Sequence, residues 1–287
     1  MSDRRTTPAN GRVAAAHLQG QVQADRFVTG AAAQVTVFAA DLCAAPHGAP
    51  DRQVLFGDIV DVYERREGWA FVQARKDGYC GYVPDTALAD PMPSTHAVRT
   101  RHTHIYPEAG LKARPLARLP FGAQIAVAGQ AGTWATVIWP GGTGQVHHDH
   151  LRPLSEPMPD PAGLAALFLG TPYLWAGNTG DGIDCSGLVQ AVCLAAHVPC
   201  PGDSDQQAAS LGIELGDNQP FRRNDAIFWK GHVALVEDAH TMIHATAHGM
   251  TTKREPIKTA IARIEAAGDG RVTARRRLFP RSVTERT

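Results

Sequence analysis

A loop rich in glycine and asparagine ends at Cys185, and an apolar pattern of helical spacing begins there. Leu188, Val189, Val192 and Ala196 would share one face of that helix. A helix N-terminus presents unpaired N–H groups and the positive end of the helix dipole, and both favour a thiolate over a thiol. We therefore expect the pKa of Cys185 to be lowered and its sulfur to act as a nucleophile.

Two histidines downstream offer a base and an orienting partner. His232 opens the alternating segment GHVALVED, and His244 lies in the next such segment, TMIHATA. A hairpin that turns at Asp238 and Ala239 would bring both imidazoles to one face. We expect His232 to form an ion pair with Cys185, and His244 to accept the Nδ1 proton of His232 and hold its ring.

Acyl transfer also needs hydrogen-bond donors for an oxyanion. The candidates are the backbone N–H of Cys185 and the phenol of Tyr173, which lies on the strand-like segment PYLW. Each residue has a structural alternative: a buried thiol, a histidine satisfied in the core, or a helix cap at Asp184. The occurrence of all of them in this order favours the catalytic interpretation.

The first half of the chain contains an internal repeat. The dipeptides Phe-Gly and Trp-Ala, which start at Phe56 and Trp69, recur 65 residues later at Phe121 and Trp134. Both copies consist of short alternating segments separated by glycines, a pattern typical of a small all-β barrel. The sequence therefore predicts two such barrels in tandem.

Changes in composition divide the chain into segments. After a proline-rich stretch, helical patterns precede alternating strands, which predicts an α+β domain with a cysteine-bearing helix on an antiparallel sheet, a papain-like arrangement. The N-terminal extension either packs against another domain or stays loose. The expected segments are 1–26 (extension), 27–92 and 93–154 (barrels), 155–163 (linker) and 164–287 (α+β domain).

Composition argues against several classes of protein. The formal net charge is +0, so no global field recruits nucleic acid. There is no apolar stretch of signal-peptide or membrane-span length, and the five cysteines are an odd count without a CxxC pair. We expect a cytoplasmic protein with no membrane partner and no cofactor. We expect no metal site either, because only His148 and His150 of VHHDHL would share a strand face.

Four segments after the linker carry a family resemblance: GTPYLWAG, DCSGLV, GHVALV and MIHA, in this order. Together they resemble the catalytic domain of the NlpC/p60-type cysteine endopeptidases of bacterial peptidoglycan. The resemblance implies that Cys185 is the nucleophile, His232 the base, His244 the third polar member and Tyr173 the tyrosine near the oxyanion site. One departure is Ala176, where the family usually has a glycine.

The two predicted barrels resemble bacterial SH3 domains, and the first copy matches better than the second. This architecture is similar to the γ-D-glutamyl-L-diamino acid endopeptidases of the dipeptidyl-peptidase VI type, which recycle murein peptides. The resemblance implies hydrolysis of the γ-D-Glu–diamino acid bond in a small murein peptide, L-Ala-γ-D-Glu-diamino acid, whose free N-terminal amine is bound. The substrate-binding residues that it implies are Asp184, Ser186, Asp203, Ser204 and, from the first SH3 domain, Tyr79.

Alternatives to these assignments stay open at this point. Ser204 and Gln207 also fit a helix capping box, and Tyr79, preferred here over Tyr82, also fits a packing residue of the barrel. A thiol-dependent amidase or acyltransferase would use the same scaffold, and a catalytically dead SH3-type protein would bind wall or peptide without cleaving it. The diamino acid and the oligomeric state are left open.

Overall fold

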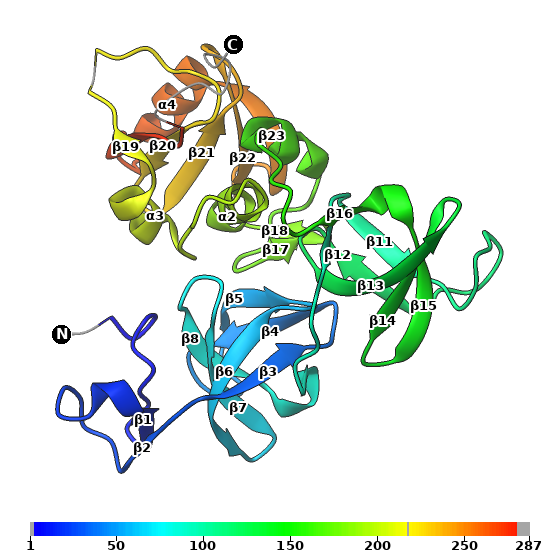
Figure 1. Ribbon diagram of the computed structural model, residues 1–287. Coiled ribbons are helices and arrows are strands. Elements are labelled where there is room, and N and C mark those ends of the chain that lie inside the picture. Colours follow the sequence, from blue (N-terminus) through cyan, green and yellow to red (C-terminus); the bar gives the residue numbers. More distant parts are fainter. Residues whose placement is uncertain (1–2, 217, 280–287) are drawn as a thin grey trace. The chain divides into compact units, whose positions relative to one another are not determined.

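The computed structural model describes residues 3–216 and 218–279. The chain divides into two compact units, residues 1–156 and 157–287. Figure 1 shows that the first unit is built of strands, whereas helices pack on a sheet in the second.

The first β module of the N-terminal unit is a seven-stranded sheet of order β5-β4-β8-β7-β6-β3-β9. Its strands alternate between the two faces, so that Ala70, Val72 and Ala74 of one strand are at most 1% exposed and build the core. The strands are β3 Ala31–Val35, β4 Ala39–Cys43, β5 Pro50–Leu55, β6 Ile59–Arg66, β7 Trp69–Ala74, β8 Cys80–Pro84 and β9 Leu88–Ala89, with a 3₁₀ turn η2 at Asp85–Ala87.

The second β module repeats this pairing in a five-stranded sheet of order β15-β14-β13-β10-β16, beside a two-stranded sheet of β11 and β12. Ala70 lies opposite Val83 in the first module, and Ala135 lies opposite Val146 in the second, so the sequence repeat occupies the same place in both. The strands are β10 His96–Val98, β11 His102–Ile105, β12 Ala117–Pro120, β13 Gln124–Ala131, β14 Trp134–Trp139, β15 Gly142–His147 and β16 Leu151–Pro153, with η3 at His148–His150.

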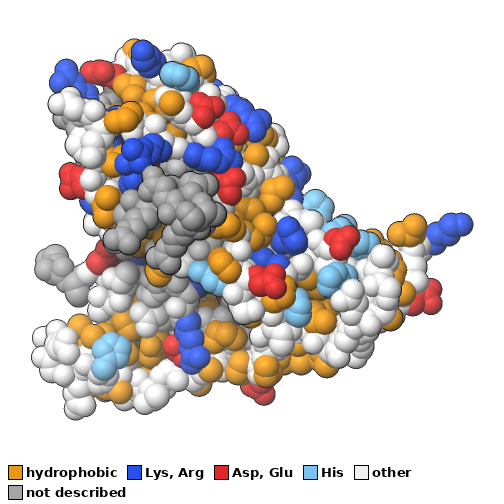
Figure 2. Space-filling model, turned by 45° about the horizontal axis from the view of Figure 1, so that its top comes forward, with side chains coloured by type: hydrophobic (Ala, Val, Ile, Leu, Met, Phe, Trp, Pro, Cys, Tyr) orange, Lys and Arg blue, Asp and Glu red, His pale blue; other side chains and the backbone are white. Residues whose placement is uncertain are grey.

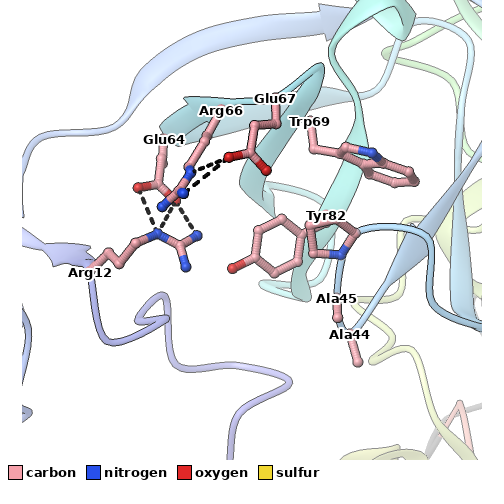
Figure 3. Close-up of a pocket in the computed structure, with 9 residues that line it drawn as sticks. Arg12, Ala44, Ala45, Glu64, Arg66, Glu67, Trp69 and Tyr82 are labelled. Atoms are coloured by element: carbon pink, nitrogen blue, oxygen red, sulfur yellow. Dashed lines mark hydrogen bonds and ion pairs between the residues drawn. The ribbon is translucent and has the colours of Figure 1, made fainter.

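The described part of the N-terminal extension packs on the first β module rather than staying loose. Arg12 Nη2 lies 2.6 Å from Glu64 Oε2, and Asn10 Nδ2 donates to the Tyr82 hydroxyl at 3.0 Å. Arg12, Glu64 and Tyr82 line a pocket of about 340 Å³ together with Trp69 (Figure 3). The elements of the extension are β1 Val13–Ala15, which pairs in parallel with β2 Arg26–Val28, and η1 Ala16–Leu18.

The C-terminal unit contains a six-stranded antiparallel sheet of order β19-β24-β20-β21-β22-β23. The alternating strands expected over the segments DAIFW, HVALVED, TMIHATA and VTARRRLF are present as β20, β21, β22 and β24, which confirms that part of the prediction. Two strands, β19 and β23, were not expected. The strands are β19 Ile213–Glu214, β20 Asp225–Trp229, β21 His232–Val236, β22 Thr241–Thr246, β23 Thr251–Pro256 and β24 Ala274–Arg277, and a small hairpin joins β17 Asn178–Thr179 to β18 Gly182–Ile183.

Helices cover this sheet. The cysteine-bearing helix α2 contacts β21 and β22, as the α+β prediction requires. A further helix, α4, was not expected, and it buries Ile257, Ala260 and Ile264 in a cluster with residues of β20, β21 and β22. The helices are α1 Pro161–Ala165 continued by η4 Ala166–Phe168, α2 Cys185–Ala195, α3 Ser204–Ser210 and α4 Ile257–Ala266.

The surface mixes both signs of charge. On the face in Figure 2, blue Lys and Arg side chains alternate with red Asp and Glu side chains, in keeping with a formal net charge of +0. Among the residues with a described structure, no helix is long and apolar enough to cross a membrane.

Candidate active site

Cys185 is the first residue of α2, so its position matches the expectation from the apolar pattern. The preceding residue, Asp184, caps the helix: its Oδ1 accepts from the backbone N of Gly187 at 2.6 Å and from the hydroxyl of Ser186 at 3.1 Å. This cap places the thiol on the first turn, where the helix amides are unpaired. Only 6% of Cys185 is exposed.

The expected effect of the helix start on the thiol is present but is outweighed. Burial raises the pKa of Cys185 to about 12, and the negative charge of Asp184 adds to the rise, whereas backbone N–H groups, including that of Ser186, lower it by less. The prediction of a lowered pKa is therefore wrong. Desolvation decides this result, because a thiolate loses more from burial than it gains from the helix amides.

The two histidines meet as expected, through different atoms. β21 and β22 pair antiparallel, and His232 Nε2 lies 2.9 Å from His244 Nδ1. The expected bond through Nδ1 of His232 is therefore wrong. Because Nε2 faces His244, only Nδ1 of His232 could serve as a base for a thiol.

The thiol of Cys185 lies close to the start of β21, the strand that carries His232. Cys185 Sγ lies 3.9 Å from the carbonyl oxygen of Gly231, the residue immediately before His232. Burial lowers the pKa of His232 to about 3, and the positive charge of His244 adds to this effect. At neutral pH these two shifts therefore favour a neutral thiol and a neutral imidazole over the expected ion pair.

A carboxylate that was not expected from the sequence, that of Glu255, extends the pair of His232 and His244. His244 is 0% exposed, and its Nε2 lies 3.0 Å from Glu255 Oε2 on β23. We call His232, His244 and Glu255 the His–His–Glu row. No hydrophobic alternation marked β23 as a strand, because its buried residues include the polar Thr252 and Glu255.

Tyr173 lies at the edge of the same site. It forms a parallel bridge with Ile183, two residues before Cys185. Burial raises the pKa of Tyr173, and the charges of Cys185 and Asp184 raise it further, so its phenol stays protonated and can donate. Its role in the oxyanion site stays a prediction.

Four of the five predicted substrate-binding residues, Asp184, Ser186, Asp203 and Ser204, lie at two helix starts. Asp203, not Ser204, is the N-cap of α3, and the capping box pairs Asp203 with Gln206. The box expected between Ser204 and Gln207 is thus wrong by one residue. Gln207 is fully buried and donates from Nε2 to the carbonyl oxygens of Ser186 and Pro201, both at 3.0 Å, which ties α3 to the first turn of α2.

Tyr79 and Tyr82 belong to the first β module. Tyr79 is 3% exposed and lies in the apolar cluster of that module, so packing accounts for its position. A contact between Tyr79 and substrate stays a prediction. Tyr82 lines the pocket in Figure 3.

The predicted absence of a metal site can be compared with the side chains. In the described part of the chain, no group of three or more His, Cys, Asp or Glu residues is arranged to hold a metal ion. His148 and His150 lie in the 3₁₀ turn η3 rather than on the continuous strand assumed from the sequence.

Comparison with known proteins assigns the family. Residues 170–265 match the NlpC/P60 family, and residues 42–88 match the bacterial dipeptidyl-peptidase SH3 domain. A γ-D-glutamyl-L-lysine dipeptidyl-peptidase of Bacillus subtilis is 30% identical over 224 residues, which cover 69% of this chain and 72% of the relative. The chain belongs to the NlpC/P60 family. The resemblance inferred from the sequence motifs is confirmed.

Two further comparisons extend this NlpC/P60 assignment. Dipeptidyl-peptidase 6 of Lysinibacillus sphaericus is 25% identical over 239 residues, which cover 75% of this chain and 88% of the relative. The crystal structure of an NlpC/P60 family protein from Bacillus cereus has a TM-score of 0.75 and 20% identity, and covers 87% of this chain and 100% of its own. The fold is thus a papain-like NlpC/P60 domain preceded by an SH3-type β region.

Proposed function

We propose that this chain is a cysteine endopeptidase that hydrolyses the γ-D-Glu–diamino acid bond of murein peptides with a free N-terminal L-Ala. The observation that carries the proposal is the juxtaposition of Cys185, at the start of α2, with the start of β21 and its hydrogen-bonded pair His232 and His244. Relatives named γ-D-glutamyl-L-lysine dipeptidyl-peptidase support the choice of bond. We also propose that it acts in the cytoplasm on small soluble peptides during peptidoglycan recycling.

The reaction begins from the neutral pair. Nδ1 of His232 removes the proton of Cys185 as Sγ attacks the γ-carbonyl carbon of D-Glu, so that charge forms only when substrate is present. The oxyanion accepts hydrogen bonds from the backbone N–H of Cys185 and from Tyr173. Collapse breaks the C–N bond, His232 gives its proton to the departing amine, and a thioester remains. Water, deprotonated by His232, then releases the γ-carboxylate and restores the thiol.

The ammonium of L-Ala needs carboxylates, because an unpaired buried charge is costly. Asp184 and Asp203 stand at the starts of α2 and α3, which Gln207 ties together, and Ser186 and Ser204 adjoin them. We assign these four residues to the amine subsite.

We also interpret the second β module as a second SH3-type barrel, because it repeats the strand pairing of the first.

The test is a digest of two matched peptides, followed by mass spectrometry. L-Ala-γ-D-Glu-meso-diaminopimelate and its N-acetylated twin differ only in the amine, and an L-Lys pair covers the other diamino acid. We expect cleavage of the free-amine peptides alone. Cys185→Ala should abolish turnover, while Cys193→Ala, a buried thiol on the same helix, serves as the matched control.

Other outcomes point elsewhere. Equal cleavage of both twins would retain the peptidase and refute the amine subsite. If neither peptide is cleaved while Cys185 reacts rapidly with iodoacetamide, a thiol-dependent amidase or acyltransferase is favoured. If Cys185 is also inert, a wall- or peptide-binding protein is favoured.

A further inference from the structure

We propose that Glu255 is a positioning residue that sets the tautomers of both histidines, and so leaves a lone pair on the His232 nitrogen available to the thiol. The inference rests on the proposed roles of Cys185 and His232. The geometry behind it is continuous: Glu255 Oε2 lies 3.0 Å from His244 Nε2, and His244 Nδ1 lies 2.9 Å from His232 Nε2.

Glu255 is held in one orientation by cations. Arg263 of α4 donates from Nε to Oε1 at 2.9 Å and from Nη2 to Oε2 at 2.8 Å, a two-point fork, and Lys253 Nζ lies 3.5 Å from Oε2. The hydrogen bond from Arg263 is the largest cause that lowers the pKa of Glu255, to about 2. At neutral pH the carboxylate is therefore ionised and can only accept hydrogen bonds.

An acceptor at this position decides where the protons lie. Neutral imidazole carries one proton, so His244 must place it on Nε2, facing Glu255, and its Nδ1 becomes an acceptor. His232 must then carry its own proton on Nε2, which leaves the lone pair on Nδ1. Nδ1 is the nitrogen that the proposed mechanism uses to accept the thiol proton, and the residue before His232, Gly231, has its carbonyl oxygen 3.9 Å from Cys185 Sγ.

The same row stabilises the charge that forms during the reaction. When His232 takes the thiol proton it becomes an imidazolium, and the acceptor nitrogen of His244 and the carboxylate of Glu255 lie in line with it. The cations Arg263 and Lys253 oppose this effect, because both lower the pKa of His244 and Arg263 also lowers that of His232. A structural role for Glu255, limited to binding Arg263 and Lys253, would predict none of these consequences for the tautomers.

The variant Glu255→Gln separates the two roles. The amide has one oxygen and no charge, so it cannot replace both oxygens of the carboxylate. If its NH₂ takes the Oε2 position, it faces His244 Nε2, the proton of His244 moves to Nδ1, and His232 must carry its proton on Nδ1, the nitrogen that should be the base. If its NH₂ takes the Oε1 position, it opposes Arg263 Nε and the tautomers stay, but the negative charge that stabilises the His232 imidazolium is lost. We expect kcat to fall by about 100- to 10,000-fold with KM nearly unchanged, as for other tautomer-setting carboxylates.

Glu237→Gln is the matched control. Glu237 forms the same kind of fork with Arg254, at 2.7 and 2.8 Å, and within the described ranges no histidine side chain is hydrogen-bonded to its carboxylate. It should leave kcat unchanged. The alkylation rate of Cys185 as a function of pH provides a readout independent of substrate, and Glu255→Gln should lower that rate near neutral pH. Wild-type kcat and alkylation in a folded Glu255→Gln variant would refute the proposal.

Nitrogen NMR of the wild-type protein covers the case in which the variant does not fold. We expect protons on Nε2 of both His232 and His244, and a proton on Nδ1 of His244 would overturn the proposal. If the wild-type chain cleaves none of the peptides, the proposed substrate is wrong, yet the NMR and alkylation results still decide the role of Glu255.

Discussion

Replacing Gly187 with alanine should disturb the active site through a steric conflict. Gly187 lies in the first turn of α2, two residues after Cys185. A Cβ there would approach the backbone oxygen of Gly177 more closely than the 3.0 Å that real Cβ atoms keep, and would also contact Asp184 Oδ1 at 3.1 Å. Because the oxygen is backbone, only movement of the loop or of the helix start can relieve the overlap.

The size of the effect follows from two opposing contributions. Overpacking of this kind costs about 1–3 kcal/mol, whereas alanine gains at most about 1 kcal/mol over glycine in helix propensity. With the full gain subtracted, the net loss is about 0–2 kcal/mol, which corresponds to a Tm lower by up to about 8 °C for a unit of this size. A displacement of about 1 Å at a nucleophile can cost about 100-fold in rate, so we expect kcat to fall at least about 10-fold.

Gly163→Ala provides the matched control for calorimetry and peptide hydrolysis. Gly163 also lies in a helix, α1, but its Cβ would meet only the side-chain ends of Asp160 and Arg223, which are about half exposed and can move. We expect this variant to keep the wild-type Tm or exceed it. The reasoning is refuted if Gly187→Ala melts no lower than Gly163→Ala and retains full activity.

Two further predictions concern stability. Burial lowers the pKa of His232 to about 3 and that of His244 to about 4. As pH falls, the unfolded chain, in which both values are near 6.5, therefore binds protons before the folded chain does. The free energy of unfolding should drop between about pH 6.5 and 4, by up to about 1.4 kcal/mol per pH unit for each histidine. The pKa of Glu255 is about 2 in the folded chain and 4.5 in the unfolded chain, so this carboxyl extends the loss of stability below about pH 4.5. Urea titrations from pH 4 to 7.5 that show a constant free energy of unfolding would contradict the prediction for the histidines. Asp203→Ala should cost about 0.5–2 kcal/mol through loss of the α3 cap, measured by thermal melting, whereas Ser204→Ala should cost less; the reverse order would restore the capping box expected from the sequence.

Much of the catalytic unit could be predicted because its strands are apolar. β20 and β21 are buried almost throughout, and the start of α2 follows from the apolar spacing after Cys185. Helix α4 was not predicted but could have been, since Ile257, Ala260 and Ile264 have helical spacing. Strand β23 could not have been predicted from hydrophobic periodicity, because polar groups buried in an ion-pair network leave no hydrophobic pattern.

Some features of the active site were likewise predictable from the sequence, and others were not. The placement of Cys185 at a helix start, and of His232 and His244 on neighbouring strands, was predictable. Local patterns assign each residue to its helix or strand, and the hairpin that joins β21 to β22 is short. The bond through His232 Nε2 and the partner Glu255 were not, because side-chain direction and contacts across strands depend on packing against α4.

By itself, the sequence determined which groups are available and in which order: a thiol at a helix start, two imidazoles on neighbouring strands, and a repeated β module ahead of them. Only the tertiary structure decided their protonation. Burial outweighs the helix amides at Cys185, and a carboxylate held by Arg263 sets the protons of His244 and His232. The physical reason is that desolvation and hydrogen-bond direction depend on all surrounding groups, most of which are distant in the sequence.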